Sequence, residues 1–108
     1  MVTYSERLYT GDKIDLKKLN RIKRNIRQGR GRFSLYIIAL SNNSHDQLDI
    51  IHNSMFKQKL YRKFDIRIVG LAQSYDEATS LVMNMLDDTM NETGTVNIKK
   101  FLEKDFSV

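Results

Sequence analysis

The chain has 108 residues, enough for one ordinary domain with a single hydrophobic core. Apolar residues make up 41% of it and charged residues 29%, a balance typical of a folded globular protein. The lack of cysteine excludes disulfides, thiolate metal sites and a cysteine nucleophile. It is compatible with a cytoplasmic protein, which is what we expect.

The positive charge is concentrated in residues 12–32. This segment holds nine Lys or Arg residues and two Asp residues, a net charge of +7. Residues 33–108 hold eight basic and ten acidic residues, a net charge of −2. A near-neutral body that carries one basic segment indicates a surface for a negatively charged partner.

The N-terminal third is predicted to contain one helix. Residues 1–11 show no clear pattern, and we expect a loosely ordered arm, although the sequence leaves open whether it joins a sheet. Residues 13–27 are predicted as an amphipathic helix, because apolar residues recur there at steps of three and four. Asp12 suits the N-cap of this helix and Gly29 suits its C-terminal end.

Three further elements have clear patterns. Residues 33–41 and 65–72 are nearly continuous apolar runs of residues that favour strands, which predicts buried strands. Residues 75–92 have the apolar spacing of a helix over several turns. Ser74 and Glu77 form a capping box at its start.

Residues 45–63 allow two interpretations. A helix can begin at residue 45, or a strand at 47–52 can be followed by a helix at about 54–62. We favour the second interpretation, because Asn53 and Ser54 suit the start of a helix better than its interior.

The elements alternate, which predicts a small α/β or α+β domain of two layers over residues 1–108. The sheet would have two strands, or three if residues 47–52 join it. A small sheet with an open face favours a homodimer. The longest unbroken apolar run is far shorter than a membrane span, and we expect no cofactor.

A set of core and cap residues extends over about residues 14–105. Its members are Arg32, Leu35, Tyr36, Tyr61, Arg62, Ile68, Val69, Gly70, Leu71, Ala72, Glu77, Ala78, Leu81, Val82, Thr93 and Gly94. In this pattern the chain resembles a small uncharacterised bacterial α/β protein family with no assigned function. The resemblance implies a single compact domain with a strand at residues 48–51, and it transfers no catalytic residue.

The basic segment carries the main functional hypothesis, a non-catalytic interaction module that binds nucleic acid or another polyanion. Cations along a helix face can neutralise phosphates and release their counterions without reading the base sequence. Acidic proteins and anionic membrane surfaces are alternative partners, and a merely solvated face is the simplest alternative. The candidate residues, from helix 13–27 and the connector 28–32, are Lys13, Lys17, Lys18, Arg21, Arg24, Arg27, Arg30 and Arg32.

His45, Asp49 and His52 support the alternative hypothesis of a small metal-dependent enzyme. In a helix these residues would lie on one face, and two imidazoles with a carboxylate can hold a divalent metal. The strand interpretation separates them. We therefore expect no metal site and no catalytic residue.

Overall fold

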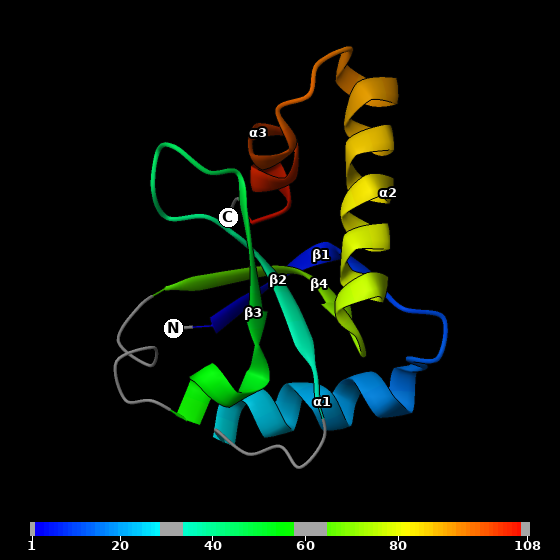
Figure 1. Ribbon diagram of the computed structural model, residues 1–108, viewed down its shortest axis with the longest axis vertical. Helices are drawn as coiled ribbons and strands as arrows, with labels where there is room; N and C mark the ends of the chain where they lie inside the picture. Colours follow the sequence, from blue (N-terminus) through cyan, green and yellow to red (C-terminus); the bar gives the residue numbers. More distant parts are fainter. Residues whose placement is uncertain (1, 29–33, 58–64, 107–108) are drawn as a thin grey trace.

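The computed structural model describes residues 2–28, 34–57 and 65–106. Four strands form one mixed sheet in the order β1-β4-β2-β3 (Figure 1). Their bounds are β1 Val2–Thr10, β2 Tyr36–Leu40, β3 Leu48–His52 and β4 Ile66–Ala72. The helical elements are α1 Leu16–Gln28, η1 Asn53–Lys57, α2 Tyr75–Thr93, α3 Ile98–Glu103 and η3 Lys104–Phe106. The prediction of a small mixed α/β domain is confirmed.

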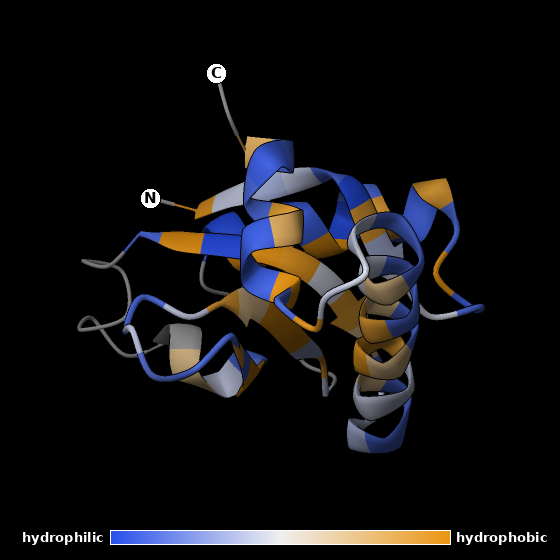
Figure 2. Ribbon diagram, turned by 90° about the horizontal axis from the view of Figure 1, so that it is seen from above, coloured by the Kyte–Doolittle hydropathy of each residue, from blue (hydrophilic) through white to orange (hydrophobic). Residues whose placement is uncertain are grey.

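The two central strands, β2 and β4, are buried on both faces. Ile37 and Ile68 belong to the core cluster that contains residues of α1, whereas Ile38 and Val69 belong to the cluster that contains residues of α2 and α3. A strand with a core on each side needs a continuous apolar run, which both sequences supply. The strands at the centre of Figure 2 are accordingly coloured largely as hydrophobic. The domain therefore has three layers, and the prediction of two layers is wrong.

The first strand is the main departure from the prediction. Residues 1–11 were expected as a loose arm, but β1 pairs in parallel with β4 as the fourth strand. The pairing is irregular, because the register shifts between Tyr4 and Tyr9. Ser5 lies buried in this bulge and donates a hydrogen bond to Asp105 Oδ2 at 3.1 Å. η3 therefore stabilises the bulge from the C-terminal end of the chain.

The other predicted strands are confirmed with slightly shorter bounds. β2 and β4 lie within residues 33–41 and 65–72, and β3 lies within residues 47–52. The strand interpretation of residues 45–63 is therefore correct. The helix expected at about 54–62 is replaced at its start by the short 3-10 turn η1, and residues 58–62 lie outside the described residues.

The longest helix, α2, begins and ends as its sequence predicts. Ser74 Oγ accepts a hydrogen bond from the Glu77 amide at 3.1 Å, while the Glu77 carboxylate accepts one from the Gln73 amide at 2.9 Å. Gly94 has a φ of 71°, in the left-handed region that favours glycine, and its amide donates to the Met90 carbonyl. Across the described ranges, no helix is long and apolar enough to cross a membrane.

Ile22 and Leu16 offer a matched test of how α1 is held on the sheet. Ile22 has no exposed surface, whereas Leu16 on the same helix is 72% exposed. Ile22→Ala should lower the free energy of unfolding by about 2–5 kcal/mol, because it removes buried surface and leaves a cavity. Leu16→Ala should lower it by less than about 0.5 kcal/mol. Urea denaturation measures both, and equal losses would contradict the role of Ile22 as an anchor.

Candidate functional site

The basic helix α1 begins at a cap that sequence reasoning placed too early. Asp12 lies in a turn, and it is Asp15 that caps the helix: its Oδ1 accepts a hydrogen bond from the Lys18 amide at 2.8 Å. The buried side chains Ile22 and Ile26 then fix α1 against the sheet. The orientation of the opposite face is thereby fixed.

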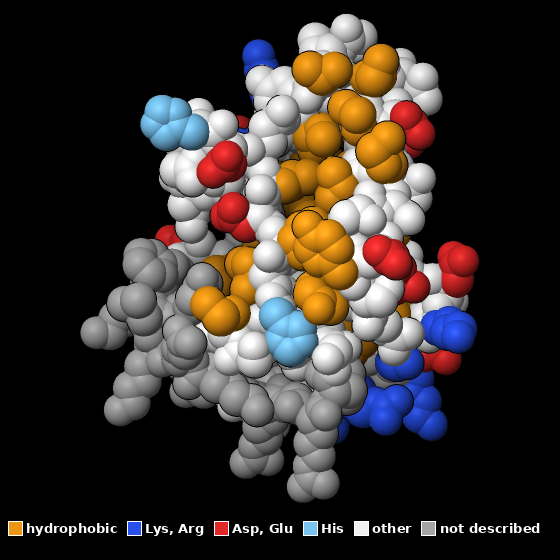
Figure 3. Space-filling model, viewed as in Figure 1, with side chains coloured by type: hydrophobic (Ala, Val, Ile, Leu, Met, Phe, Trp, Pro, Cys, Tyr) orange, Lys and Arg blue, Asp and Glu red, His pale blue; other side chains and the backbone are white. Residues whose placement is uncertain are grey.

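The outward face of α1 carries a ridge of cations. Lys17, Arg21 and Arg24 follow one another at steps of four and three residues, and all three are exposed. These steps place them on successive turns, about 6 Å and 4.5 Å apart along the helix axis. Lys13 precedes the helix and Arg27 lies near its end, and both are also exposed. Figure 3 shows basic side chains gathered at the lower right, where α1 begins.

The positive charge of this ridge is not neutralised within the described part of the chain. The ion pairs there join Arg7 of β1 to Asp105 of η3 and Arg67 of β4 to Glu103 of α3, so neither includes a residue of α1. Among the described residues, no carboxylate lies within ion-pair distance of an α1 cation. The ridge is therefore available to an external anion.

Two basic residues of α1 differ from the ridge. Lys18 is only half exposed, and the Nζ of Lys23 lies 4.7 Å from the centre of the Tyr4 ring, a cation–π contact that ties α1 to β1. Burial raises the pKa of Tyr4 to about 12, and the positive charge of Arg27 opposes this increase. The remaining predicted residues, Arg30 and Arg32, lie outside the described residues.

The alternative metal set is not brought together. His45 lies in the turn before β3, and Asp49 and His52 point to opposite faces of that strand because they are three residues apart. His52 Nδ1 is hydrogen-bonded to Ser54 Oγ at 2.8 Å, and its ring meets the Tyr36 ring edge-on. Within the described ranges, no group of three His, Cys, Asp or Glu side chains could hold a metal ion.

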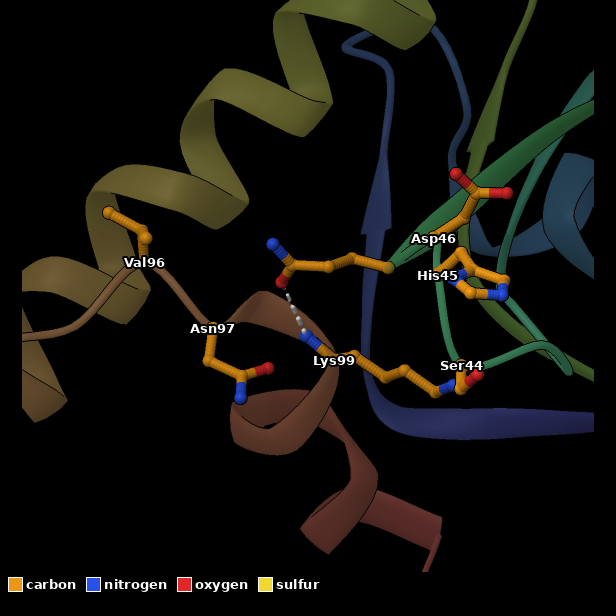
Figure 4. Close-up of a pocket in the computed structure, with 7 residues that line it drawn as sticks. Ser44, His45, Asp46, Val96, Asn97 and Lys99 are labelled. Carbon is orange, nitrogen blue, oxygen red and sulfur yellow. Dashed lines mark hydrogen bonds between the residues drawn. The ribbon is translucent and has the colours of Figure 1, made fainter.

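A shallow hollow of about 390 Å³ separates the turn before β3 from the link between α2 and α3. Several polar groups around the hollow are hydrogen-bonded to each other or to the neighbouring backbone. Gln47 Oε1 accepts a hydrogen bond from the Lys99 amide at 3.3 Å (Figure 4), and Lys99 Nζ donates one to the Asn43 carbonyl at 2.9 Å. In Figure 4 the His45 ring and the Asp46 carboxylate point away from the side of Asn97. These hydrogen bonds hold the turn against α3, and the side chains around the hollow do not converge as a catalytic group would.

Sequence reasoning missed a second surface. Tyr75, Met83 and Met90 lie on α2 with 56%, 56% and 50% of their surface exposed. The sequence does carry a signal for it. Apolar residues occupy a wider arc of α2 than one buried stripe requires, since Val82 and Leu86 extend the stripe toward Met83.

No protein-family model, curated protein or solved structure matches this chain. The resemblance to an uncharacterised bacterial family therefore stays a prediction. The functional argument depends on the geometry of the chain itself.

The raised pKa of the half-buried Tyr9 predicts a loss of stability at alkaline pH. Tyr9 donates a hydrogen bond to Asp88 Oδ2 at 2.5 Å, and burial, followed by this bond and the charge of Asp88, raises its pKa to about 12 from 10.0. The folded state therefore keeps a proton that the unfolded state loses above pH 10. The free energy of unfolding should fall as the pH rises from about 10 towards 12.

The contribution of Tyr9 can be separated by comparing Tyr9→Phe with the unchanged chain. Phe cannot ionise, so the loss of stability between pH 10 and 12 should be smaller in the variant. Urea denaturation across this pH range measures the loss, and phenolate absorbance should show one late-titrating tyrosine fewer. An identical pH dependence of stability in the two proteins would contradict the assignment of this stability loss to Tyr9.

Proposed function

We propose that this protein is a non-catalytic interaction module that binds the phosphates of nucleic acid through the outward face of α1. The observation that carries the proposal is the exposed ridge of Lys17, Arg21 and Arg24, which has no carboxylate partner among the described residues. Each cation that neutralises a phosphate releases counterions, which supplies affinity that is independent of base sequence.

The ridge is preorganised for this role. Ile22 and Ile26 are buried beneath it, so binding does not require the helix to fold or to reorient. The polar side chains Asn20 and Gln28 are also exposed on α1 and can donate hydrogen bonds to phosphate oxygens. The described helix presents no aromatic side chain, so the geometry favours contacts to the phosphate backbone over stacking on bases.

The same ridge is less suited to a membrane surface. Leu16 is the exposed large apolar residue of α1, while Ile22 and Ile26 are buried in the core. One leucine offers little area for insertion at a lipid interface. Anionic vesicles and an acidic protein such as polyglutamate therefore serve as comparison ligands, and tighter binding to either would contradict the proposal.

Fluorescence anisotropy with a labelled DNA duplex at about 50 and 200 mM salt tests the proposal. Three phosphate contacts give a log–log salt slope of about −2.7, so the fourfold increase in salt should weaken binding by about 40-fold. Arg21→Glu with Arg24→Glu should abolish most of the binding at the lower salt and flatten the slope by about 2. No binding at the lower salt would overturn the proposal.

A charge-matched pair locates the surface. Arg24→Glu and Lys100→Glu each change the net charge by the same amount, and both residues are exposed, but Lys100 lies on α3. Arg24→Glu should weaken duplex binding by at least about 10-fold, and Lys100→Glu should change it by less than about twofold because long-range screening limits its effect. Equal losses would show that only the overall charge matters.

A further inference from the structure

The layer opposite α1 exposes an apolar strip, which we define as Tyr36, Leu48, Ile50, Tyr75, Val82, Met83, Leu86 and Met90. Its sheet side comes from β2 and β3, where Tyr36, Leu48 and Ile50 are half-buried against the second core cluster. Its helix side comes from α2, where Tyr75, Met83 and Met90 are at least half exposed. Figure 3 shows hydrophobic side chains in a nearly continuous column along α2.

The strip exists because α2 does not cover the whole sheet. α2 packs on β4 and β2, the central strands, and β3 extends the sheet beyond them as an edge strand. The Tyr36 ring fills the space between the two sides, in edge contact with both Tyr75 and His52. An exposed apolar surface of this extent usually marks a binding site.

Carboxylates border the strip along α2, and one more lies in the turn before β3. Asp76 and Asp87 are eleven residues apart on α2, close to three full turns, so they share one face beside Met83. Asp46 lies in the turn before β3, whereas Asp49 points to the opposite face of the sheet, on the side of Ala39. Asp46, Asp76 and Asp87 are exposed, and Figure 3 shows acidic side chains on either side of the apolar column, with no Lys or Arg side chain visible between them.

This arrangement fits one kind of occupant. An apolar centre that carboxylates border along α2 is complementary to an amphipathic helix whose apolar stripe is flanked by Lys and Arg. From Tyr75 to Met90 the strip is about 22 Å long, which matches about four turns of such a helix. The thioethers of Met83 and Met90 adapt to apolar side chains of different shapes.

A second copy of the chain fits less well. The strip of a second copy contains no Lys or Arg to pair with Asp76 and Asp87, so a face-to-face dimer would leave these carboxylates without an opposite charge. The chain's own basic helix, α1, is also unsuited, because its apolar residues Ile22 and Ile26 are buried in its own core. We infer that the apolar strip binds a basic amphipathic helix from another protein.

Two synthetic peptides test this inference. One has about 18 residues, with leucine at the spacing of one helix face and lysine elsewhere, and it would form a helix of about 27 Å. The other replaces every lysine with glutamate. The leucine–lysine peptide should bind at least about 10-fold more tightly than the leucine–glutamate peptide and than a scrambled leucine–lysine peptide. Equal binding of the scrambled peptide would overturn the inference, because it would show simple charge attraction.

Variants then place the peptide on the strip. Asp76→Lys with Asp87→Lys reverses the charge of the α2 border and should weaken binding of the leucine–lysine peptide by at least about 10-fold, while strengthening binding of the leucine–glutamate peptide. Glu6→Lys with Glu92→Lys is the matched control, because both residues are exposed and lie away from the strip. Equal effects of the two double variants would overturn the inference.

Met83→Lys with Met90→Lys tests the apolar centre. Both side chains are at least half exposed, so the fold should survive, which circular dichroism checks. Binding of the leucine–lysine peptide should fall by at least about 10-fold. Sedimentation velocity of the unchanged chain tests whether a second copy occupies the strip. A dimer that this double variant dissociates would identify the occupant as a second copy and overturn the inference.

Discussion

The antiparallel pairing of β2 with β4 is the constraint on which the rest of the structure depends. Ile37 and Ile38 are adjacent in β2 and point to opposite faces, and neither has any exposed surface. Both faces of this pair must therefore be covered. The chain covers one face with the helix that precedes β2 and the other with the helices that follow β4. This division decides which face of each helix remains available to a partner.

The parts of the fold that follow from local patterns could be predicted. The continuous apolar runs fixed β2 and β4, and Ser74 with Gly94 fixed the ends of α2. β1 could not be predicted, because its register shifts between Tyr4 and Tyr9 and polar residues fill the bulge. Its stability comes from distant partners, such as Asp105 beside Ser5, which no local pattern encodes. The third layer was also missed because it depends on distant contacts. The periodicity of a helix does not indicate which face of a sheet the helix covers.

The two surfaces differ in how visible they are in the sequence. The ridge of α1 could be predicted because charge is a property of single residues, and a helix with a clear apolar stripe fixes the direction of the opposite face. The structure adds which cations are exposed, and it shows that Lys23 packs on Tyr4. The apolar strip was hidden because Leu48, Ile50 and Tyr36 have the composition of core residues. Their exposure depends on how far α2 extends over the sheet, which is a tertiary property.

The positions of the two surfaces also determine how they can influence each other. α1 lies on one face of the sheet, and the strip lies on the face that carries α2 and α3, so a ligand on one does not block the other (Figure 1). Among the described elements, β2 contributes to both, with Ile37 facing α1 and Tyr36 facing the strip. Coupling between the surfaces would require this strand, which is buried from Ile37 to Leu40, to adopt two arrangements, and close-packed strands resist such a change. The geometry therefore favours a module that holds a polyanion and a basic helix at the same time and independently, each attracted by charge of the opposite sign.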